Sequence, residues 1–268
     1  MDIGAVLRHL DMLFKEKELA QVEPYLLRQR QMAQAEGDRT AELTLDNELA
    51  GFYRSVSRAS EAIAMADAAL ALVGEMGLAE TMPHATTLIN RATALRAAGQ
   101  LPEAAADYQA ALRIVETEQE KGYLLASLCN NMSQVDQTLG RHEAAIALLE
   151  RALTALSALA GVDAEIATTH SNLAISLIAL GRYEAARTHL AQALALFEAG
   201  DGPRDAHYGA ALAAAGELAY HEGAYERAVA FFTRALPEIR ASFGENDGYQ
   251  TTQRNLARAQ RALEEAER

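Results

Sequence analysis

Apolar residues recur at helical spacing through most of the chain. In one stretch they are Ala104, Tyr108 and Ala111, which are separated by four and three positions. These separations place the three side chains on one face of an α-helix. Two alanines let a neighbouring helix approach closely, and the large residue between them fills the remaining space. The pattern therefore predicts a helix that packs through this face.

Four copies of this helix occur, and each follows a glycine. The glycines are Gly99, Gly140, Gly181 and Gly223, which recur at nearly equal intervals. The large residues of the four helices are Tyr108, Leu149, Leu190 and Phe232. A period of about 20–50 residues indicates a solenoid, in which each unit buries its apolar face only against its neighbours.

Another helix is predicted before each glycine. Its apolar positions also recur at helical spacing, as in Leu173, Leu177 and Leu180. Glycine is favoured at a helix C-terminus because it adopts a positive φ without strain. The unit is therefore a first helix, a glycine turn, a second helix and a longer loop. Repetition of this unit predicts an all-α solenoid of antiparallel helix pairs.

The turn and the second helix resemble the tetratricopeptide repeat. The spacing in this chain is Gly-x-aromatic-x2-Ala-x3-large-x2-Ala, with Tyr183 and Tyr225 at the aromatic position. The second helix of that family carries the same alanine pattern. HEAT repeats also have about 40–47 residues, but the Gly-x-aromatic turn favours the tetratricopeptide repeat. The resemblance implies a right-handed superhelical solenoid with a C-terminal capping helix.

Some features depart from the usual repeat. The Leu-Gly pair of the family's first helix survives only in part, as Leu173-Ala174 and Ala215-Gly216, and the chain has no Trp. The period exceeds the usual length of about 34 residues. The longer unit resembles the repeats of kinesin light chains and their bacterial relatives. The segments Ser171-Asn172-Leu173-Ala174 and 243–247 support that resemblance.

We expect a single solenoid domain over residues 1–268, since no Pro- or Gly-rich linker interrupts the chain. Residues 1–36 are predicted to form a degenerate first helix pair, with Pro24 interrupting its second helix. Residues 248–267 are predicted to form a capping helix with a polar end, as a terminal repeat requires. The repeats between them span 43–80, 84–119, 123–160, 165–200 and 207–243.

Charge and composition exclude several partners. Lys and Arg total 24 against 37 Asp and Glu, a net charge of −13. This acidity opposes binding to nucleic acid and to anionic membranes. Cys129 is the single cysteine, so no internal disulfide forms. We find no signal peptide and no run of about 18 apolar residues. A cytoplasmic protein is therefore expected.

Motifs for catalysis are absent from the sequence. There is no GxxxxGK[ST], GxGxxG or HExxH sequence, and the seven histidines are scattered without metal-ligand spacing. Cys129 is expected to be a small buried residue and not a nucleophile. We therefore expect no enzyme activity, no cofactor and no metal.

Four asparagines stand at the same position of their first helices. They are Asn90, Asn131, Asn172 and Asn255, each one period after the last except Asn255, which follows Asn172 by two periods. A carboxamide both donates and accepts hydrogen bonds, as an extended peptide backbone requires from its binding partner. By resemblance to the kinesin light chain class, these four residues are implied to contact a bound peptide. Alternatively, each asparagine bonds to the neighbouring repeat and fixes the superhelix.

Further polar residues are predicted on the same face. Asn130 and Gln134 extend a polar, uncharged surface, and Tyr220 is a candidate aromatic contact. A basic set, opposed by few acids, occupies related positions and favours a partner that is acidic or ends in a carboxylate. Its members are Arg54, Arg96, Arg254, Arg258 and Arg261. Alternatively, the arginines of the last helix only solvate an exposed end.

The sequence thus predicts a non-catalytic scaffold or adaptor that binds an extended peptide segment of another protein in a concave groove. One alternative is a peptide-sensing regulator that changes conformation on ligand binding, and another is an accessory subunit of an enzyme. A homodimer is a further option, since Leu7, Leu10, Leu13 and Phe14 lie on adjacent faces of the N-terminal helix.

Overall fold

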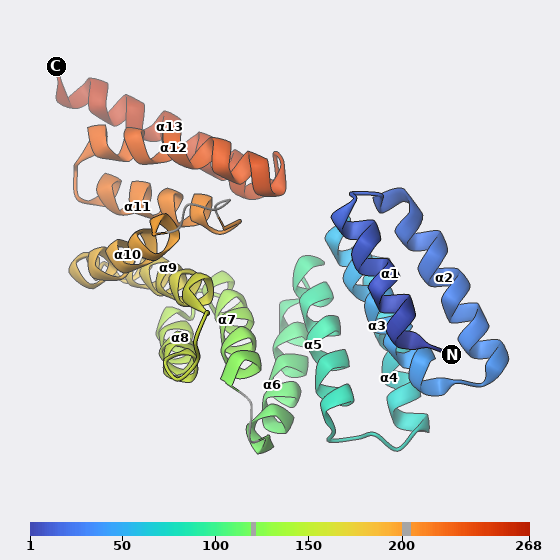
Figure 1. The fold of residues 1–268 in the computed structure, drawn as a ribbon. Coiled ribbons are helices and arrows are strands. Elements are labelled where there is room, and N and C mark those ends of the chain that lie inside the picture. Colours follow the sequence, from blue (N-terminus) through green and yellow to red (C-terminus); the bar gives the residue numbers. More distant parts are fainter. Residues whose placement is uncertain (119–121, 200–204) are drawn as a thin grey trace. The chain divides into compact units, whose positions relative to one another are not determined.

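The computed structural model describes residues 1–118, 122–199 and 205–268, and these contain thirteen α-helices and no strand (Figure 1). The predicted all-α fold is confirmed. The chain divides into two compact units, which we call the first unit (1–121) and the second unit (122–268). The prediction that both units form one continuous solenoid domain stays a prediction.

Consecutive helices form pairs, in which odd-numbered helices are first helices and even-numbered helices are second helices (Figure 1). The first unit contains α1 (Ile3–Lys15), α2 (Leu19–Glu36), α3 (Arg39–Ser55), α4 (Ala59–Glu75), α5 (Met82–Ala97) and α6 (Leu101–Thr117). The second unit contains α7 (Gly122–Thr138), α8 (His142–Leu156), α9 (Asp163–Ala179), α10 (Tyr183–Glu198), α11 (Tyr208–His221), α12 (Tyr225–Phe243) and the last helix α13 (Asp247–Ala266).

The helices of a pair approach closely because a small residue of the first faces a large residue of the second. A Cβ added to Gly216 would lie 2.7 Å from the ring of Phe232, which is completely buried. The same position of the other first helices, two turns before the glycine turn, holds a small buried residue. These residues are Ala50, Ala92, Ser133 and Ala174.

The alanines predicted to form the packing face of the second helices are completely buried. They are Ala62, Ala104, Ala145, Ala186 and Ala228, with Ala69, Ala111, Ala152, Ala193 and Ala235 further along each helix. The large residue between them is also buried, as Tyr108 and Phe232 show. The face predicted from the spacing of apolar residues is thus confirmed.

The glycine turns have the predicted backbone conformation. Gly99 has φ 77° and Gly181 has φ 71°. The next residue in each case, Gln100 or Arg182, donates its amide hydrogen to a carbonyl of the last helical turn. This is the usual hydrogen-bonding pattern of a helix that ends in glycine.

From α3 on, the first helices within each unit lie close to one another. Helix α3 contacts α5, and α9 contacts both α7 and α11. Each second helix instead packs against its own partner and the first helix that follows within its unit. The first helices therefore line one shared face of each unit. None of the described helices is long and apolar enough to cross a membrane.

Pro24 does not interrupt the helix that contains it, so this prediction was wrong. Helix α2 runs unbroken from Leu19 to Glu36 with Pro24 inside it. Because Pro24 has no backbone N–H, the helix lacks one of its hydrogen bonds there. Val22 and Leu26 on either side are completely buried, and their packing holds the helix in place.

The N-terminal helix uses much of its apolar face inside the first unit. Leu10 and Leu13 are buried in a core that includes Val22 and Leu26 of α2. Phe14 is 39% exposed. Leu10 and Leu13 are therefore not part of an exposed dimer surface, because these two side chains pack within the unit. The homodimer stays an untested option.

A histidine pair joins α9 to α10 in the second unit. The Nδ1 atoms of His170 and His189 are 2.9 Å apart, so one ring donates a hydrogen bond to the other. Burial, together with the charge of His189, lowers the pKa of His170 to about 4. Burial also lowers the pKa of His189, although Glu150 opposes this effect. Both rings therefore favour the neutral form in the folded chain.

We predict that Gly216→Ala destabilises the chain by about 1–3 kcal/mol, because the new methyl group would overlap the buried ring of Phe232. Gly51→Ala is the matched control, since a Cβ there meets nothing within 4 Å. That control should be stabilising by up to about 1 kcal/mol through helix propensity. Denaturant unfolding measures both; equal effects of the two substitutions would rule out the close packing.

The histidine pair predicts a pH-dependent stability. The folded-state pKa of His170 is lowered from 6.5 to about 4, so the stability that its neutral ring contributes is complete above pH 6.5 and is lost as the pH falls toward 4. Between about pH 7 and about pH 4.5, His170→Gln should lose less thermal stability than the wild type. His9→Gln, an exposed histidine of the first unit, is the control. Parallel losses in wild type and His170→Gln would contradict the prediction.

Candidate functional site

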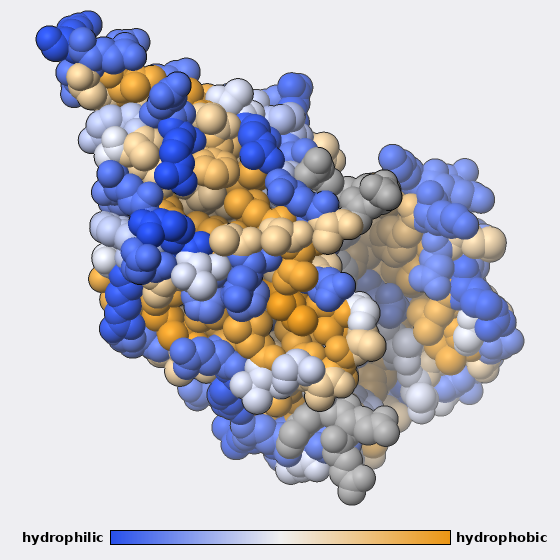
Figure 2. All heavy atoms as spheres, turned by 60° about the vertical axis from the view of Figure 1, so that its left-hand side comes forward, coloured by the Kyte–Doolittle hydropathy of each residue, from blue (hydrophilic) through white to orange (hydrophobic). Residues whose placement is uncertain are grey.

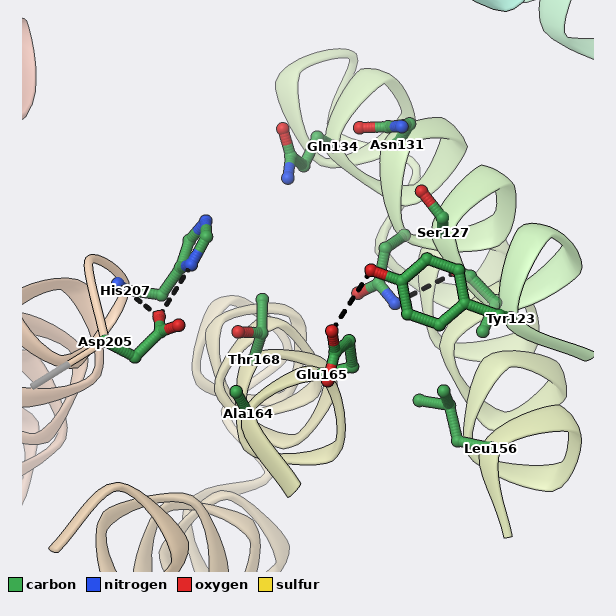
Figure 3. A pocket seen from close by; sticks show the side chains of 12 residues that line it. Tyr123, Ser127, Asn131, Gln134, Leu156, Ala164, Glu165, Thr168, Asp205 and His207 are labelled. Atoms are coloured by element: carbon green, nitrogen blue, oxygen red, sulfur yellow. Dashed lines mark hydrogen bonds and ion pairs between the residues drawn. The ribbon is translucent and has the colours of Figure 1, made fainter. Parts of the chain in front are cut away.

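A groove opens between α7 and α9 of the second unit, on the face lined by first helices (Figure 3). Its volume is about 220 Å³. The side chains that give it its chemistry are Tyr123, Ser127, Asn131 and Gln134 of α7, with Glu165 and Thr168 of α9. It is therefore a polar groove of amides and hydroxyls with a carboxylate.

The α7 side of the groove is a single helical stripe. Tyr123, Ser127, Asn131 and Gln134 follow one another at separations of four, four and three positions, which place them on one face. The carboxamides of Asn131 and Gln134 have no hydrogen-bond partner among the described residues. Figure 3 shows both side chains at the edge of the space between α7 and α9. They are available to a ligand.

Two carboxylates occupy the other parts of the groove. The hydroxyl of Tyr123 donates to Oε1 of Glu165 at 3.1 Å, and this bond raises the pKa of Tyr123 above its ordinary value. Asp205, just before α11, accepts from the backbone N–H of His207 at 2.7 Å and pairs with its Nδ1 at 2.9 Å. Asp205 and His207 lie beside the α9 end of the groove (Figure 3).

Below these groups, a set of side chains that we call the amide lock ties α7 to α9. The Nδ2 of Asn130 donates to Oγ1 of Thr169 at 2.9 Å, and the Nδ2 of Asn172 donates to Oδ1 of Asn130 at 3.0 Å. Thr169 is completely buried. Gln137 adds a bond from α7 to the backbone carbonyl of Asn172 at 2.8 Å.

The amide lock occurs again in the first unit, between α3 and α5. There the Nδ2 of Asn47 donates to Oγ1 of Thr87 at 3.0 Å, and the Nδ2 of Asn90 donates to Oδ1 of Asn47 at 2.8 Å. Asn90 and Asn172 thus hold successive first helices together. This arrangement matches the alternative that the sequence left open, in which an asparagine bonds to the neighbouring repeat.

Asn255 and Arg258 of α13 are tied to α11. Both donate to the carboxylate of Glu217, Asn255 at 3.1 Å and Arg258 at 2.7 and 2.6 Å. The guanidinium of Arg258 also lies over the ring of Tyr220, 4.1 Å from its centre. Asn255, Arg258 and Tyr220, which were predicted as site residues, therefore form a cluster with Glu217. This cluster holds α13 against α11.

Arg54 and Arg96 belong to the first unit. Arg54 is exposed near the end of α3, and Arg96 is half-buried near the end of α5. The Nε atom of Arg96 is buried without a hydrogen-bond partner among the described residues. Neither arginine is among the residues that line the groove between α7 and α9.

A second hollow, of about 170 Å³, lies between α10, α11 and α12. Its lining is mainly apolar, with Leu190, Leu218 and Phe231 beside an ion pair of Arg187 and Glu222. The face of the second unit that Figure 2 turns forward likewise shows apolar side chains between polar ones. This hollow lacks the hydrogen-bonding groups that distinguish the groove between α7 and α9.

The structure brings only part of the predicted site together. Asn130, Asn131 and Gln134 share the groove, whereas Asn255, Arg258 and Tyr220 form the cluster with Glu217. Two groups of residues were not predicted from the sequence: Asn47, Thr87 and Thr169 of the lock, and Glu165, Asp205 and His207 of the groove lining. A signal for the lock was present, because Asn47 and Asn130 stand two periods apart, as Thr87 and Thr169 do.

The repeat pattern and the paired helices match a known family. The family model described as the tetratricopeptide repeat matches residues 83–158 and 165–237, more than half of the chain. The chain belongs to the tetratricopeptide repeat family. No curated protein matches its sequence.

Solved structures share this fold at low sequence identity. The apo form of the quorum sensor NprR from B. thuringiensis is 15% identical, with a TM-score of 0.71, over 93% of this chain and 68% of NprR. The apo form of RapI is 14% identical, with a TM-score of 0.70, over 98% of this chain and 72% of RapI. A putative kinesin light chain of Podosopora anserina with nearly identical TPR-like repeats is 18% identical, with a TM-score of 0.61, over 76% of this chain and 97% of that protein. At these identities, the three similarities concern the fold.

The amide lock predicts a cost for removing its central residue. Asn47→Ala leaves the Nδ2 of Asn90 without its acceptor and should destabilise the first unit by about 1–3 kcal/mol. Amide hydrogen exchange should also become faster in α5. Thr44→Ala is the control, because that hydroxyl bonds to a carbonyl of its own helix. If Asn47→Ala lowers the unfolding midpoint no more than Thr44→Ala does, the lock is not a stabilising contact.

Proposed function

We propose that this chain is a non-catalytic scaffold that binds an extended peptide segment of a partner protein in the groove between α7 and α9. The observation that carries the proposal is the pair of carboxamides, Asn131 and Gln134, that line the groove without partners among the described residues. A carboxamide can donate to a peptide carbonyl and accept from a peptide N–H. An extended segment presents both groups along its length.

The proposal assigns the predicted asparagines two different roles. Asn131 has the available carboxamide, whereas Asn172 is bonded to Asn130 beneath the groove. A bound peptide therefore contacts Asn131 and Gln134 in this proposal, and the lock keeps α7 and α9 at a fixed separation. A preformed groove of this kind reduces the entropy that is lost on binding.

Sequence features support the rest of the proposal. The net charge of −13 opposes phosphate binding, and no catalytic motif is present. The proposal therefore includes no reaction, cofactor, nucleic acid or membrane. We place the scaffold in the cytoplasm, where the single cysteine stays reduced.

A peptide-sensing regulator is the second candidate. It is favoured by the similarity of the fold to NprR, which is a quorum sensor. The two candidates share the same groove and differ in whether binding changes the conformation of the chain.

Affinity capture from the source lysate tests the proposal. We predict that the wild type retains one protein that Asn131→Ala combined with Gln134→Ala loses, because the backbone of the ligand then lacks its hydrogen-bond partners. A peptide from that protein should slow hydrogen exchange in α7 and α9. Thr154→Ala on α8 combined with Ser157→Ala directly after it is the control, since both exposed hydroxyls bond to backbone carbonyls of α8.

If the wild type and the groove variant retain the same proteins, the groove is not the binding site. If the captured protein is lost equally from the α8 control, the effect is one of general destabilisation and the assignment to the groove fails.

A further inference from the structure

Among the described residues that line the groove between α7 and α9, the fixed charges are negative. They are the carboxylates of Glu165 and Asp205, and none of the described lining residues is Lys or Arg. The remaining polar groups are neutral amides and hydroxyls, together with the imidazole of His207. The lining thus attracts cations and repels carboxylates.

These two carboxylates differ from others of the second unit. Glu143, Glu217 and Glu222 each form an ion pair with an arginine. Among the described residues, neither Glu165 nor Asp205 is paired with Lys or Arg. Glu165 accepts a hydrogen bond from the neutral hydroxyl of Tyr123, and Asp205 is paired with His207, which is charged only if protonated. Within the described part of the chain, no permanent cation therefore neutralises these two charges.

Each carboxylate also retains an oxygen for a ligand. Tyr123 bonds to Oε1 of Glu165, and His207 bonds to Oδ1 of Asp205. Oε2 and Oδ2 have no hydrogen-bond partner in the described part of the chain. The side chain of Asp205 is 34% exposed, so the site is partly shielded from solvent. Partial shielding strengthens the attraction between a carboxylate and a bound cation.

We infer that the peptide segment held in this groove carries a Lys or Arg side chain, whose cation is bound by Glu165 and Asp205. The inference rests on the proposed function, in which Asn131 and Gln134 bind the backbone of the same segment. A cationic side chain supplies the donors that the two carboxylates lack, and such charge-assisted bonds are among the stronger hydrogen bonds in proteins.

For this groove, the inference names a basic peptide segment, whereas the sequence led us to expect an acidic partner. The acidic partner was expected from arginines on the first helices. The structure places Arg54 and Arg96 in the first unit and pairs Arg258 with Glu217. No arginine of that set lines the groove, so an acidic segment would meet two like charges there.

Selection from a displayed random dodecapeptide library, with the full chain as bait, tests the inference. We expect the wild type to enrich peptides with Lys or Arg at one position and to exclude Asp and Glu there. Glu165→Gln combined with Asp205→Asn should abolish the basic preference. Glu264→Gln combined with Glu265→Gln removes the same charge from exposed positions of α13 and should leave the preference intact.

The binding affinity of a synthetic copy of one enriched peptide measures how much the carboxylates contribute. Glu165→Gln alone should weaken its binding about 10- to 150-fold, as expected for the loss of a hydrogen bond to a charged group. Added salt should weaken binding to the wild type more than to Glu165→Gln, because salt screens the attraction.

The outcomes separate the two proposals. Enriched peptides with no basic preference, or with a preference that the double groove variant retains, overturn the inference but leave a peptide-binding groove. If no peptide is enriched, the proposed function itself fails, and the inference fails with it.

Discussion

The contact between a small residue of each first helix and a large residue of its second helix sets the geometry of this molecule. Gly216 against Phe232 is a tight example, since even one added methyl group would overlap the ring. Two helices that approach this closely behave as one rigid pair. Because the first helices of successive pairs also contact one another within each unit, their exposed sides form a shared face on which polar side chains are held in fixed positions.

On that face, polar residues have two distinct roles. Asn130, Thr169 and Asn172 use their hydrogen-bonding groups on one another and hold α7 at a fixed separation from α9. Asn131 and Gln134 stand further round the face of α7 and keep their carboxamides available. The lock recurs between α3 and α5, so it is not confined to the second unit. The groove chemistry depends instead on residues that only the second unit brings together.

Much of the fold could be predicted from the sequence, because alanine spacing and glycine turns act locally. The buried positions of Ala104, Tyr108 and Ala111 follow from periodicity alone. Pro24 was misread because the packing of Val22 and Leu26 outweighs one lost backbone bond.

The site was harder to predict than the fold. Adjacent asparagines such as Asn130 and Asn131 look alike in sequence. Both line the groove, but the carboxamide of Asn130 is bonded to α9, whereas that of Asn131 has no partner among the described residues. Glu165 begins one repeat and Asp205 precedes the next, and the two share no motif. Their proximity is a product of the folded stack, which no local pattern records.

The central claim is that the face of the first helices in the second unit is a recognition surface, with its ligand between α7 and α9. A crystal structure of the full chain with a bound peptide tests this claim most directly. Our account predicts a segment whose backbone bonds to Asn131 and Gln134, while Asn172 keeps its bond to Asn130. A peptide bound along the second helices, or one that takes Asn172 away from Asn130, would contradict it.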